Sequence, residues 1–188
     1  LHPVDKWSNL SCSRIAIGQG VAVTAMQMLD AYCTIANDGV RMRPYVVKRV
    51  VGSTGAVLFE QQPRELGRPV TRETARVMAR LLEGVTDDGG TGVKARVDGY
   101  TVAGKTGSAQ KPVAGGYSAT DYVASFVGFL PAERPAIGII VVVDGPQPCH
   151  VGGLVAAPVF SEIAAQSVRY LDIVPASRMT VPVVASRR

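Results

Sequence analysis

The fold of this chain is decided at residues 100–111, which run Tyr-Thr-Val-Ala-Gly-Lys-Thr-Gly-Ser-Ala-Gln-Lys. The first three residues favour a β-strand, and the Asp98-Gly99 pair before them is a turn signal. A lysine, two hydroxyl residues and a glycine then occupy positions 105–108. A strand that served only for packing would carry apolar side chains there, so we expect this strand to line a functional site.

Two further strands are predicted close behind it, at residues 122–130 and 136–144. The turn at 131–135 separates these two, and a Gly-rich loop at 112–120 is expected between the first two. Strands with short links lie antiparallel beside each other. We therefore expect the three strands to form one antiparallel sheet.

Three helices are predicted from apolar residues that recur with helical spacing. Thr24 and Thr71 suit the N-caps of the first two, and Pro158 suits the first turn of the third. The fold class predicted is α+β, an antiparallel sheet flanked by helices. The inner faces are expected to hold Ala25, Met28, Leu29, Tyr32, Cys33 and Ala36, then Val77, Met78, Leu81, Leu82 and Val85, and last Val159, Phe160, Ile163, Ala164, Val168 and Leu171.

The composition fits a globular protein. With 188 residues and 47% apolar content the chain can bury a sizeable core, and its longest apolar run, 136–143, is far too short to cross a bilayer. The formal net charge is +5, but lysines and arginines are scattered along the sequence, so we expect no nucleic acid partner. Residues 1–20 are expected to be irregular. The chain does not begin with Met, and we expect it to start within a longer protein.

Two motifs overlap the central strand, and both need a helix. Residues 99–106 fit G-x-x-x-x-G-K-T, the phosphate-binding P-loop, whose Lys-Thr must begin a helix. Residues 108–111 fit S-x-x-K, in which lysine deprotonates serine because residues three apart share a helix face. On a strand they point to opposite faces. Ser108 is therefore not expected to be a nucleophile, and a P-loop NTPase is kept only as a remote alternative.

As part of a strand, residues 105–108 suit one wall of an acyl-transfer site. Lys105 can carry charge or relay protons. Thr106 and Ser108 share a face, where their hydroxyls can donate to a carboxylate, and Gly107 lets a ligand backbone approach closely. An exposed strand edge can also hold an extended peptide by main-chain pairing. These four residues are the candidate site.

Lys105-Thr106-Gly107-Ser108 resembles the K-T-G-[ST] box of penicillin-binding proteins and serine β-lactamases. Over about residues 8–173 the flanks resemble the septal, class B D,D-transpeptidases. The matching segments are Gly18-Gln19-Gly20, Ala36-Asn37-Asp38-Gly39, Gly89-Gly90-Thr91-Gly92-Val93-Lys94, Gly104 to Lys111, and Gly152-Gly153 through Ala156-Ala157-Pro158-Val159-Phe160.

This resemblance implies a five-stranded antiparallel sheet, of which the chain would supply the third, fourth and fifth strands and the last helix. Lys105 would join a proton-relay network. Thr106 and Ser108 would bind the carboxylate of a D-Ala-D-Ala stem peptide or of a β-lactam, with Gly107 between them. The Ser108 backbone N–H would be one oxyanion donor. No cofactor and no metal are expected.

Residues 1–173 are accordingly assigned to the C-terminal part of a transpeptidase domain, and 174–188 to a tail. Residues 44–59 alternate around a turn at 52–55 and predict a hairpin, taken as an insertion at about 44–60.

Two family motifs are missing from the chain, a helical S-x-x-K and an S-x-N loop, both normally upstream. Residues 11–14, Ser-Cys-Ser-Arg, end in arginine, which cannot act as a base. We therefore expect the nucleophile in an N-terminal part of the same protein and expect this fragment alone to be inactive. The family further implies peptidoglycan cross-linking at division, with division-complex proteins as partners. The site would face the periplasm or the extracytoplasmic side of the inner membrane, anchored by a segment outside this chain.

Two alternatives share these residues: a penicillin-sensing receptor domain, and a non-catalytic module of the division complex. His150 follows Cys149 in a loop after the last strand. Adjacent ligands without partners are weak evidence for zinc, so a loop at the rim of the substrate cleft is the favoured interpretation. Tyr117, Asp121 and Tyr122 border either this cleft or the surface.

Overall fold

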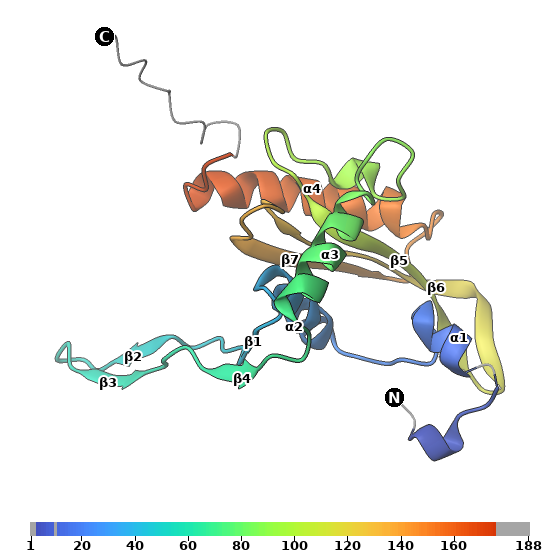
Figure 1. Cartoon of the computed structure of the whole chain (residues 1–188), viewed down its shortest axis with the longest axis horizontal. Coiled ribbons are helices and arrows are strands. Elements are labelled where there is room, and N and C mark those ends of the chain that lie inside the picture. Colours follow the sequence, from blue (N-terminus) through green and yellow to red (C-terminus); the bar gives the residue numbers. More distant parts are fainter. Residues whose placement is uncertain (1–2, 10, 176–188) are drawn as a thin grey trace, which may run out of the picture.

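The computed structural model describes residues 3–9 and 11–175. At its centre is an antiparallel sheet of β5 (Ala103–Val113), β6 (Gly116–Leu130) and β7 (Ile137–Asp144), in the spatial order β5-β6-β7 (Figure 1). The predicted order and direction of the strands are therefore confirmed. Among the described residues, β5 and β7 each pair on one side only, so each presents a free edge.

The loop expected at 112–120 is wrong. β5 continues to Val113, which pairs with Gly116 at the start of β6, and Gly115 turns the chain at a φ of +83°. Proline lacks the N–H of a ladder hydrogen bond and is tolerated at sheet edges and bulges. Pro112 meets both conditions, because β5 is an edge strand and the register shifts between Gln110 and Pro112.

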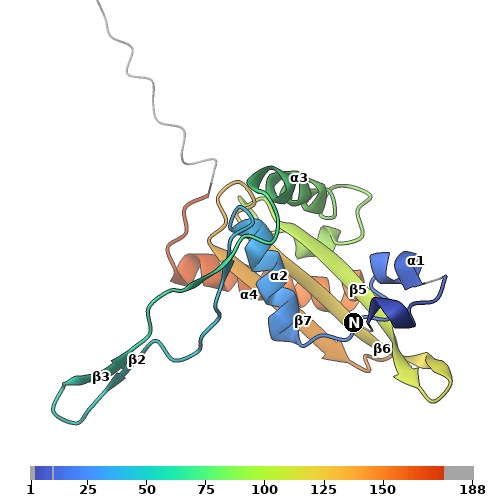
Figure 2. The same ribbon diagram turned by 60° about the horizontal axis from the view of Figure 1, so that its bottom comes forward.

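Helix α4 (Gly152–Tyr170) covers one face of the sheet (Figure 2). Phe126 of β6 packs edge-on against Phe160, with ring centroids 4.7 Å apart, and both side chains are fully buried. Burying one such side chain stabilises the folded state by about 1.5–3 kcal/mol. The remaining core residues of this face are Ala95, Val97, Val102, Leu130, Ile139, Val141, Ala156, Ala157, Ala164 and Val168.

The start and the inner face predicted for this helix are partly wrong. The helix begins at Gly152, so Pro158 lies inside it rather than in its first turn. Phe160, Ala164 and Val168 are buried as expected, but Val159 and Ile163 are exposed, as is Leu171 after the helix end. The small residues Ala156 and Ala157 take the inner positions, because they let the helix axis lie close to the sheet.

Helices α2 (Ala25–Ala36) and α3 (Arg72–Glu83) cover the opposite face, where Leu82, Ala103, Phe129 and Ala132 form a second core. Both predicted N-caps are confirmed. Thr24 Oγ1 accepts from the Gln27 N–H at 3.2 Å, and the Gln27 side chain accepts from the Thr24 N–H. Thr71 Oγ1 accepts from the Thr74 N–H at 3.1 Å. Such caps typically contribute about 1 kcal/mol each.

The buried faces expected on these two helices are partly wrong. On α2, Ala25, Met28 and Cys33 are exposed. On α3, Leu82 is buried, but Val77, Met78 and Leu81 are exposed, Leu81 by 65%. An apolar stripe says which side of a helix avoids water but not what covers it. In the described part of the chain these side chains are only partly covered: Met28, Val77 and Met78 stay 37–41% exposed, and the Cys33 sulfur lies against Gly138.

The predicted hairpin is present as β2 (Arg49–Val51) and β3 (Val57–Glu60), which extend away from the body (Figure 1). At its base, β1 (Arg41–Met42) pairs with β4 (Glu65–Gly67), a pairing that the sequence did not predict.

Three short helical segments were also not predicted: η1 (Val4–Lys6), α1 (Ser11–Ala16) and η2 (Val93–Ala95). The first two lie where an irregular chain was expected, so that expectation is wrong. No helix in the described ranges is long and apolar enough to span a membrane. Of the predicted tail at 174–188, residues 176–188 lie outside the described residues.

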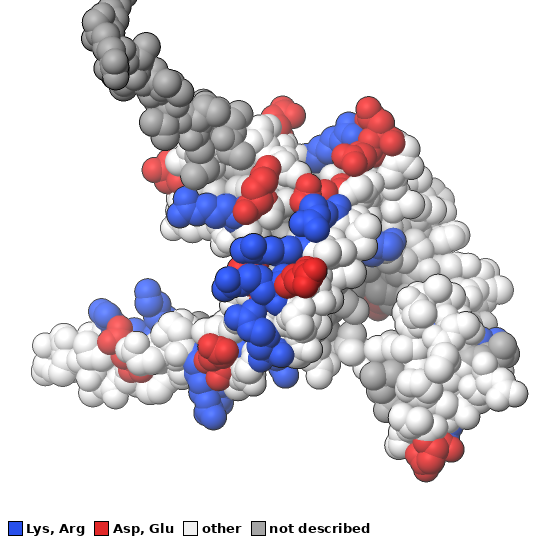
Figure 3. Space-filling model, viewed as in Figure 1, with Lys and Arg blue, Asp and Glu red and all other residues white. Residues whose placement is uncertain are grey.

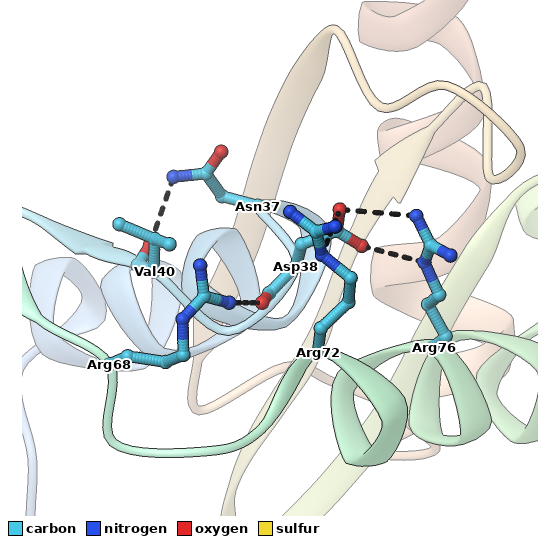
Figure 4. A network of polar contacts seen from close by, with 6 residues as sticks. All are labelled: Asn37, Asp38, Val40, Arg68, Arg72 and Arg76. Carbon is cyan, nitrogen blue, oxygen red and sulfur yellow. Dashed lines mark hydrogen bonds and ion pairs between the residues drawn. The ribbon is translucent and has the colours of Figure 1, made fainter.

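Three arginine side chains, one from the segment before α3 and two from α3 itself, lie around Asp38 (Figure 4). Arg76 donates to Asp38 Oδ1 at 2.9 Å and to Oδ2 at 3.3 Å, and Arg72 Nε lies 3.3 Å from Oδ2. Arg68 donates to the Asp38 backbone carbonyl. Because Asp38 follows α2 and two of the arginines belong to α3, the cluster ties the two helices together. Figure 3 shows blue side chains gathered over α3, so the expected scatter of basic residues does not hold on this face.

The hydrogen bond from Arg76, followed by the charges of the arginines, lowers the pKa of Asp38. A lowered folded-state pKa means that the carboxylate stabilises the fold above its unfolded pKa of about 3.9 and loses this effect as the pH falls through the folded value. Asp38→Asn keeps a residue that tolerates the positive φ of 51° at this position.

We predict that Asp38→Asn lowers the melting temperature at pH 7 and that its difference from wild type closes below about pH 4. Thermal unfolding from pH 7 to pH 3 measures this difference. Asp98→Asn is the control, because no ion pair joins Asp98 to any described residue. A difference for Asp38→Asn that stays constant with pH would contradict the prediction.

Candidate functional site

The four candidate residues lie in the middle of β5. Lys105 and Thr106 pair with Val127 and Phe126, and the strand continues to Val113. The helix that a P-loop requires after its lysine and threonine is therefore replaced by a strand. The S-x-x-K match also fails as a pair, because Lys111 forms an ion pair with Asp144 at the far end of β5.

A chain of polar contacts joins Lys105 to the loop before η2. The exposed Lys105 ammonium lies 3.2 Å from both the Thr106 Oγ1 and the Thr106 backbone carbonyl, and donates to them. Thr106 Oγ1 in turn lies 3.0 Å from Thr91 Oγ1. Thr91 comes from the loop after α3, so the site combines a strand and a loop that are distant in sequence.

The second hydroxyl of the wall meets the start of α4. The Gly152 backbone N–H donates to Ser108 Oγ at 2.9 Å. The first N–H groups of a helix have no partner within the helix, and a side-chain oxygen that accepts from one satisfies it. Because the Ser108 oxygen accepts here, the Ser108 proton is free to point elsewhere.

This contact requires glycine at two positions of α4. A Cβ on Gly152 would lie 2.2 Å from the Gly107 carbonyl oxygen and 2.5 Å from that of Ser125. A Cβ on Gly153 would lie 2.0 Å from the Thr91 carbonyl oxygen. All of these neighbours are backbone atoms that cannot turn aside. The helix therefore approaches the sheet more closely than any residue with a side chain permits.

Within the wall, glycine is favoured less strictly, because the nearest neighbour is a side chain. A Cβ on Gly107 would lie 2.4 Å from Ser125 Oγ on the neighbouring strand. A side chain at position 107 would therefore require the Ser125 hydroxyl to rotate away, whereas glycine leaves it in place.

Beyond the wall, the structure places His150 beside the same hairpin. Its ring stacks on Tyr122 with centroids 3.8 Å apart, and Gln110 of β5 lies 3.4 Å from the Tyr122 hydroxyl. Asp121 instead accepts a hydrogen bond from Ser118. No group of three or more metal-binding side chains occurs within the described ranges, so Cys149 and His150 lack the partners of a zinc site there.

Taken together, these contacts leave hydrogen-bond donors available along β5. Lys105 contributes an ammonium group, Ser108 a free hydroxyl proton, and Thr106 a further hydroxyl between Lys105 and Thr91. Hydrogen bonds to an ionised acceptor are roughly twice as strong as neutral ones. The arrangement therefore suits a ligand that carries a carboxylate.

The sequence pointed to Lys105, Thr106, Gly107 and Ser108 but assigned no role to Thr91 or Gly152 as individual residues. Both lie in glycine-containing segments, 89–94 and 152–153, that were used only for the family resemblance. Their glycines were the available signal, because a glycine outside a turn often marks a close backbone approach.

Comparison with known proteins identifies the family. Residues 2–165 match the family described as the penicillin binding protein transpeptidase domain. This chain belongs to that family. The resemblance inferred from the K-T-G box and its flanks is confirmed, as is the expected fold class, an antiparallel sheet with helices on its faces.

The penicillin-binding protein relatives are close enough in sequence to support this assignment. Penicillin-binding protein PbpB of Mycolicibacterium smegmatis is 40% identical over 174 residues, which cover 87% of this chain and 27% of the relative. Stage V sporulation protein D of Bacillus subtilis is 35% identical over 177 residues, which cover 93% of this chain and 27% of the relative. The chain thus spans less than a third of these relatives.

Solved structures agree with the sequence comparison. Penicillin binding protein 3 from Mycobacterium tuberculosis, complexed with ampicillin, superposes with a TM-score of 0.83 and 34% identity, covering 100% of this chain and 44% of that one. The transpeptidase domain of penicillin-binding protein 3 from Burkholderia pseudomallei gives 0.80 and 36%, covering 94% and 51%.

We predict that Gly152→Ala destabilises the protein, because its Cβ collides with two backbone carbonyls of the transpeptidase sheet. Overpacking of this kind costs about 1–3 kcal/mol. Gly116→Ala is the matched control, since its Cβ meets open space. Thermal unfolding of both variants in the protein that carries this chain tests the prediction, and equal melting temperatures for the two would refute it.

Proposed function

We propose that this chain is the C-terminal part of a D,D-transpeptidase of the septal class B type, which cross-links peptidoglycan stem peptides through a serine acyl-enzyme. The observation that carries the proposal is the set of hydrogen-bond donors at Lys105, Thr106 and Ser108 on the edge strand β5 of a transpeptidase-family fold.

The proposed substrate is an extended stem peptide that ends in D-Ala-D-Ala. Its backbone pairs with the free edge of β5, as peptides do when they extend a sheet. Its terminal carboxylate accepts hydrogen bonds from Thr106 and Ser108, while Gly107 keeps the strand flat beside it. The Ser108 backbone N–H serves as one oxyanion donor for the acylated carbonyl.

In the proposed reaction, a serine from an upstream part of the protein attacks the carbonyl between the two D-alanines. The C–N bond breaks, the terminal D-Ala leaves with the serine proton, and an acyl-enzyme remains. An amine from a second stem peptide then takes the acyl group and restores the serine. Lys105 acts in the proton relay and stabilises developing negative charge.

The upstream part is itself the first proposed partner. The free edge of β7 offers unpaired backbone groups for further strands, which a complete sheet would use. The exposed apolar side chains Met28, Val77 and Leu81 offer surface for further helices. Both features fit a domain whose other half lies earlier in the sequence. The assignment of 1–173 to this domain and 174–188 to a tail is part of the same proposal.

β-Lactams are the second proposed class of ligand, because they combine a carboxylate with a reactive amide, as the stem peptide does. The Mycobacterium tuberculosis relative is described in complex with ampicillin, which supports this extension. Since peptidoglycan is the substrate, we place the site in the periplasm or on the extracytoplasmic face of the membrane. Anchoring would come from a segment outside this chain, and division-complex proteins are the proposed further partners.

We predict that Lys105→Ala in the complete protein slows acylation by a labelled penicillin about 100-fold or more, the range expected for loss of a proton-transfer group. Lys111→Ala is the control on the same strand, because Lys111 pairs with Asp144 rather than with Thr106. The rate of penicillin adduct formation is measured for both variants and for wild type, and only Lys105→Ala is expected to be slow. Unchanged acylation in Lys105→Ala would remove Lys105 from the mechanism.

The same labelled protein locates the nucleophile. After digestion, mass spectrometry should find the penicillin adduct on a peptide from outside residues 1–188. An adduct on Ser108 would instead overturn the view that β5 is a binding wall. An acylated protein that never releases or transfers its acyl group would support a penicillin-sensing receptor in place of a transpeptidase.

A further inference from the structure

We propose that Thr91 is a positioning residue that sets the direction of the Thr106 hydroxyl, so that Thr106 donates its proton to the substrate carboxylate. This inference rests on the proposed function and adds to it a residue outside the K-T-G box. It follows from counting the hydrogen-bond capacity of the Thr106 oxygen.

A threonine hydroxyl has one proton to donate and two lone pairs that accept. The Lys105 ammonium, 3.2 Å from Thr106 Oγ1, can only donate, so it occupies one lone pair. Thr91 Oγ1, at 3.0 Å, can act either way: it accepts the Thr106 proton, or it donates into the second lone pair. Without a ligand, the hydrogen bond between Thr91 and Thr106 can therefore run in either direction.

A carboxylate removes that choice. Ionised carboxylates only accept hydrogen bonds, so Thr106 can hold one only with its single proton. Thr91 must then be the donor, and the protons run in one direction from Thr91 through Thr106 to the ligand. In such a chain each hydrogen bond polarises the next. With Thr91 donating, all three capacities of the Thr106 oxygen are used.

Ser108 shows the same principle with a fixed partner. The Gly152 backbone N–H can only donate, so the Ser108 oxygen accepts and its proton is left for a ligand. Thr91 would do for Thr106 what Gly152 does for Ser108. Both hydroxyls of the wall are then turned outward by groups that donate from behind.

Backbone packing holds Thr91 in place independently of Thr106. The Thr91 carbonyl lies against Gly153 of α4, where a Cβ would come within 2.0 Å. The next residue, Gly92, donates its N–H to the Val85 carbonyl at 2.8 Å, and a Cβ on Gly92 would lie 2.7 Å from the Phe126 ring. The Thr91 side chain therefore starts from a fixed backbone, and removing its hydroxyl leaves the loop anchored.

The test compares Thr91→Val, which keeps the shape but loses the hydroxyl, with Thr91→Ser, which keeps the hydroxyl. Both are made in the complete protein, and the second-order acylation rate constant is measured with benzylpenicillin and with its methyl ester, which has no carboxylate. For benzylpenicillin we expect Thr91→Val to be about two- to twelvefold slower, the effect of one hydrogen bond. Thr91→Ser should match wild type.

The methyl ester separates positioning from a general structural role. If Thr91 acts through Thr106 on the carboxylate, the two proteins, wild type and Thr91→Val, react equally fast with the ester. In a Thr106→Val background, adding Thr91→Val should produce no further loss with benzylpenicillin. Both results together would establish the chain from Thr91 through Thr106 to the carboxylate.

Other outcomes overturn the inference. An equal loss with penicillin and ester would show that Thr91 only supports the fold, and no loss with either would show that Thr106 needs no such partner. A wild-type protein that benzylpenicillin does not acylate would remove the proposed function itself, and this inference with it. An acylated wild type with an unaffected Thr91→Val variant removes only the inference.

Discussion

The close contact between the start of α4 and the middle of β5 is the constraint on which the rest of this structure depends. Gly152 and Gly153 bring helix backbone against strand and loop backbone, at separations that leave no room for a Cβ. Only this approach lets the Gly152 N–H reach Ser108. It also sets the depth at which α4 lies on the sheet, and so lets Phe160 meet Phe126 in the core.

The same contact helps to hold the polar groups of β5 in a fixed arrangement. β5 pairs with β6 on one side, so its backbone is ordered before any ligand arrives. Lys105 is one neighbour of Thr106, and the start of α4 contacts Ser108 from behind, so the donors are held in position in advance. Preorganised donors stabilise an anion without paying reorganisation at the moment of binding.

The apolar patterns of α2 and α3 correctly predicted two helices, but they did not predict which of the apolar side chains are buried. Thr24 and Thr71 begin their helices as predicted because capping is a local interaction, encoded within a few residues. Val77 and Leu81 were expected to be buried and are exposed, because burial depends on what lies opposite. A chain that matches less than a third of its relatives' length can lack that opposite surface.

The sequence by itself determined the antiparallel order of β5, β6 and β7, the two helix caps, and a hairpin that was expected at about 44–60 and has its strands at 49–60. It also selected residues 105–108 as the candidate site. Each of these follows from spacing or from chemistry between near neighbours. Only the tertiary structure decided that Thr91 contacts Thr106, that Gly152 contacts Ser108 and that three arginines share Asp38. The contact of Thr106 with Thr91 joins residues 15 positions apart in the sequence, and that of Ser108 with Gly152 joins residues 44 positions apart. Such distances carry no periodic signal, because they are set by how closely whole elements pack.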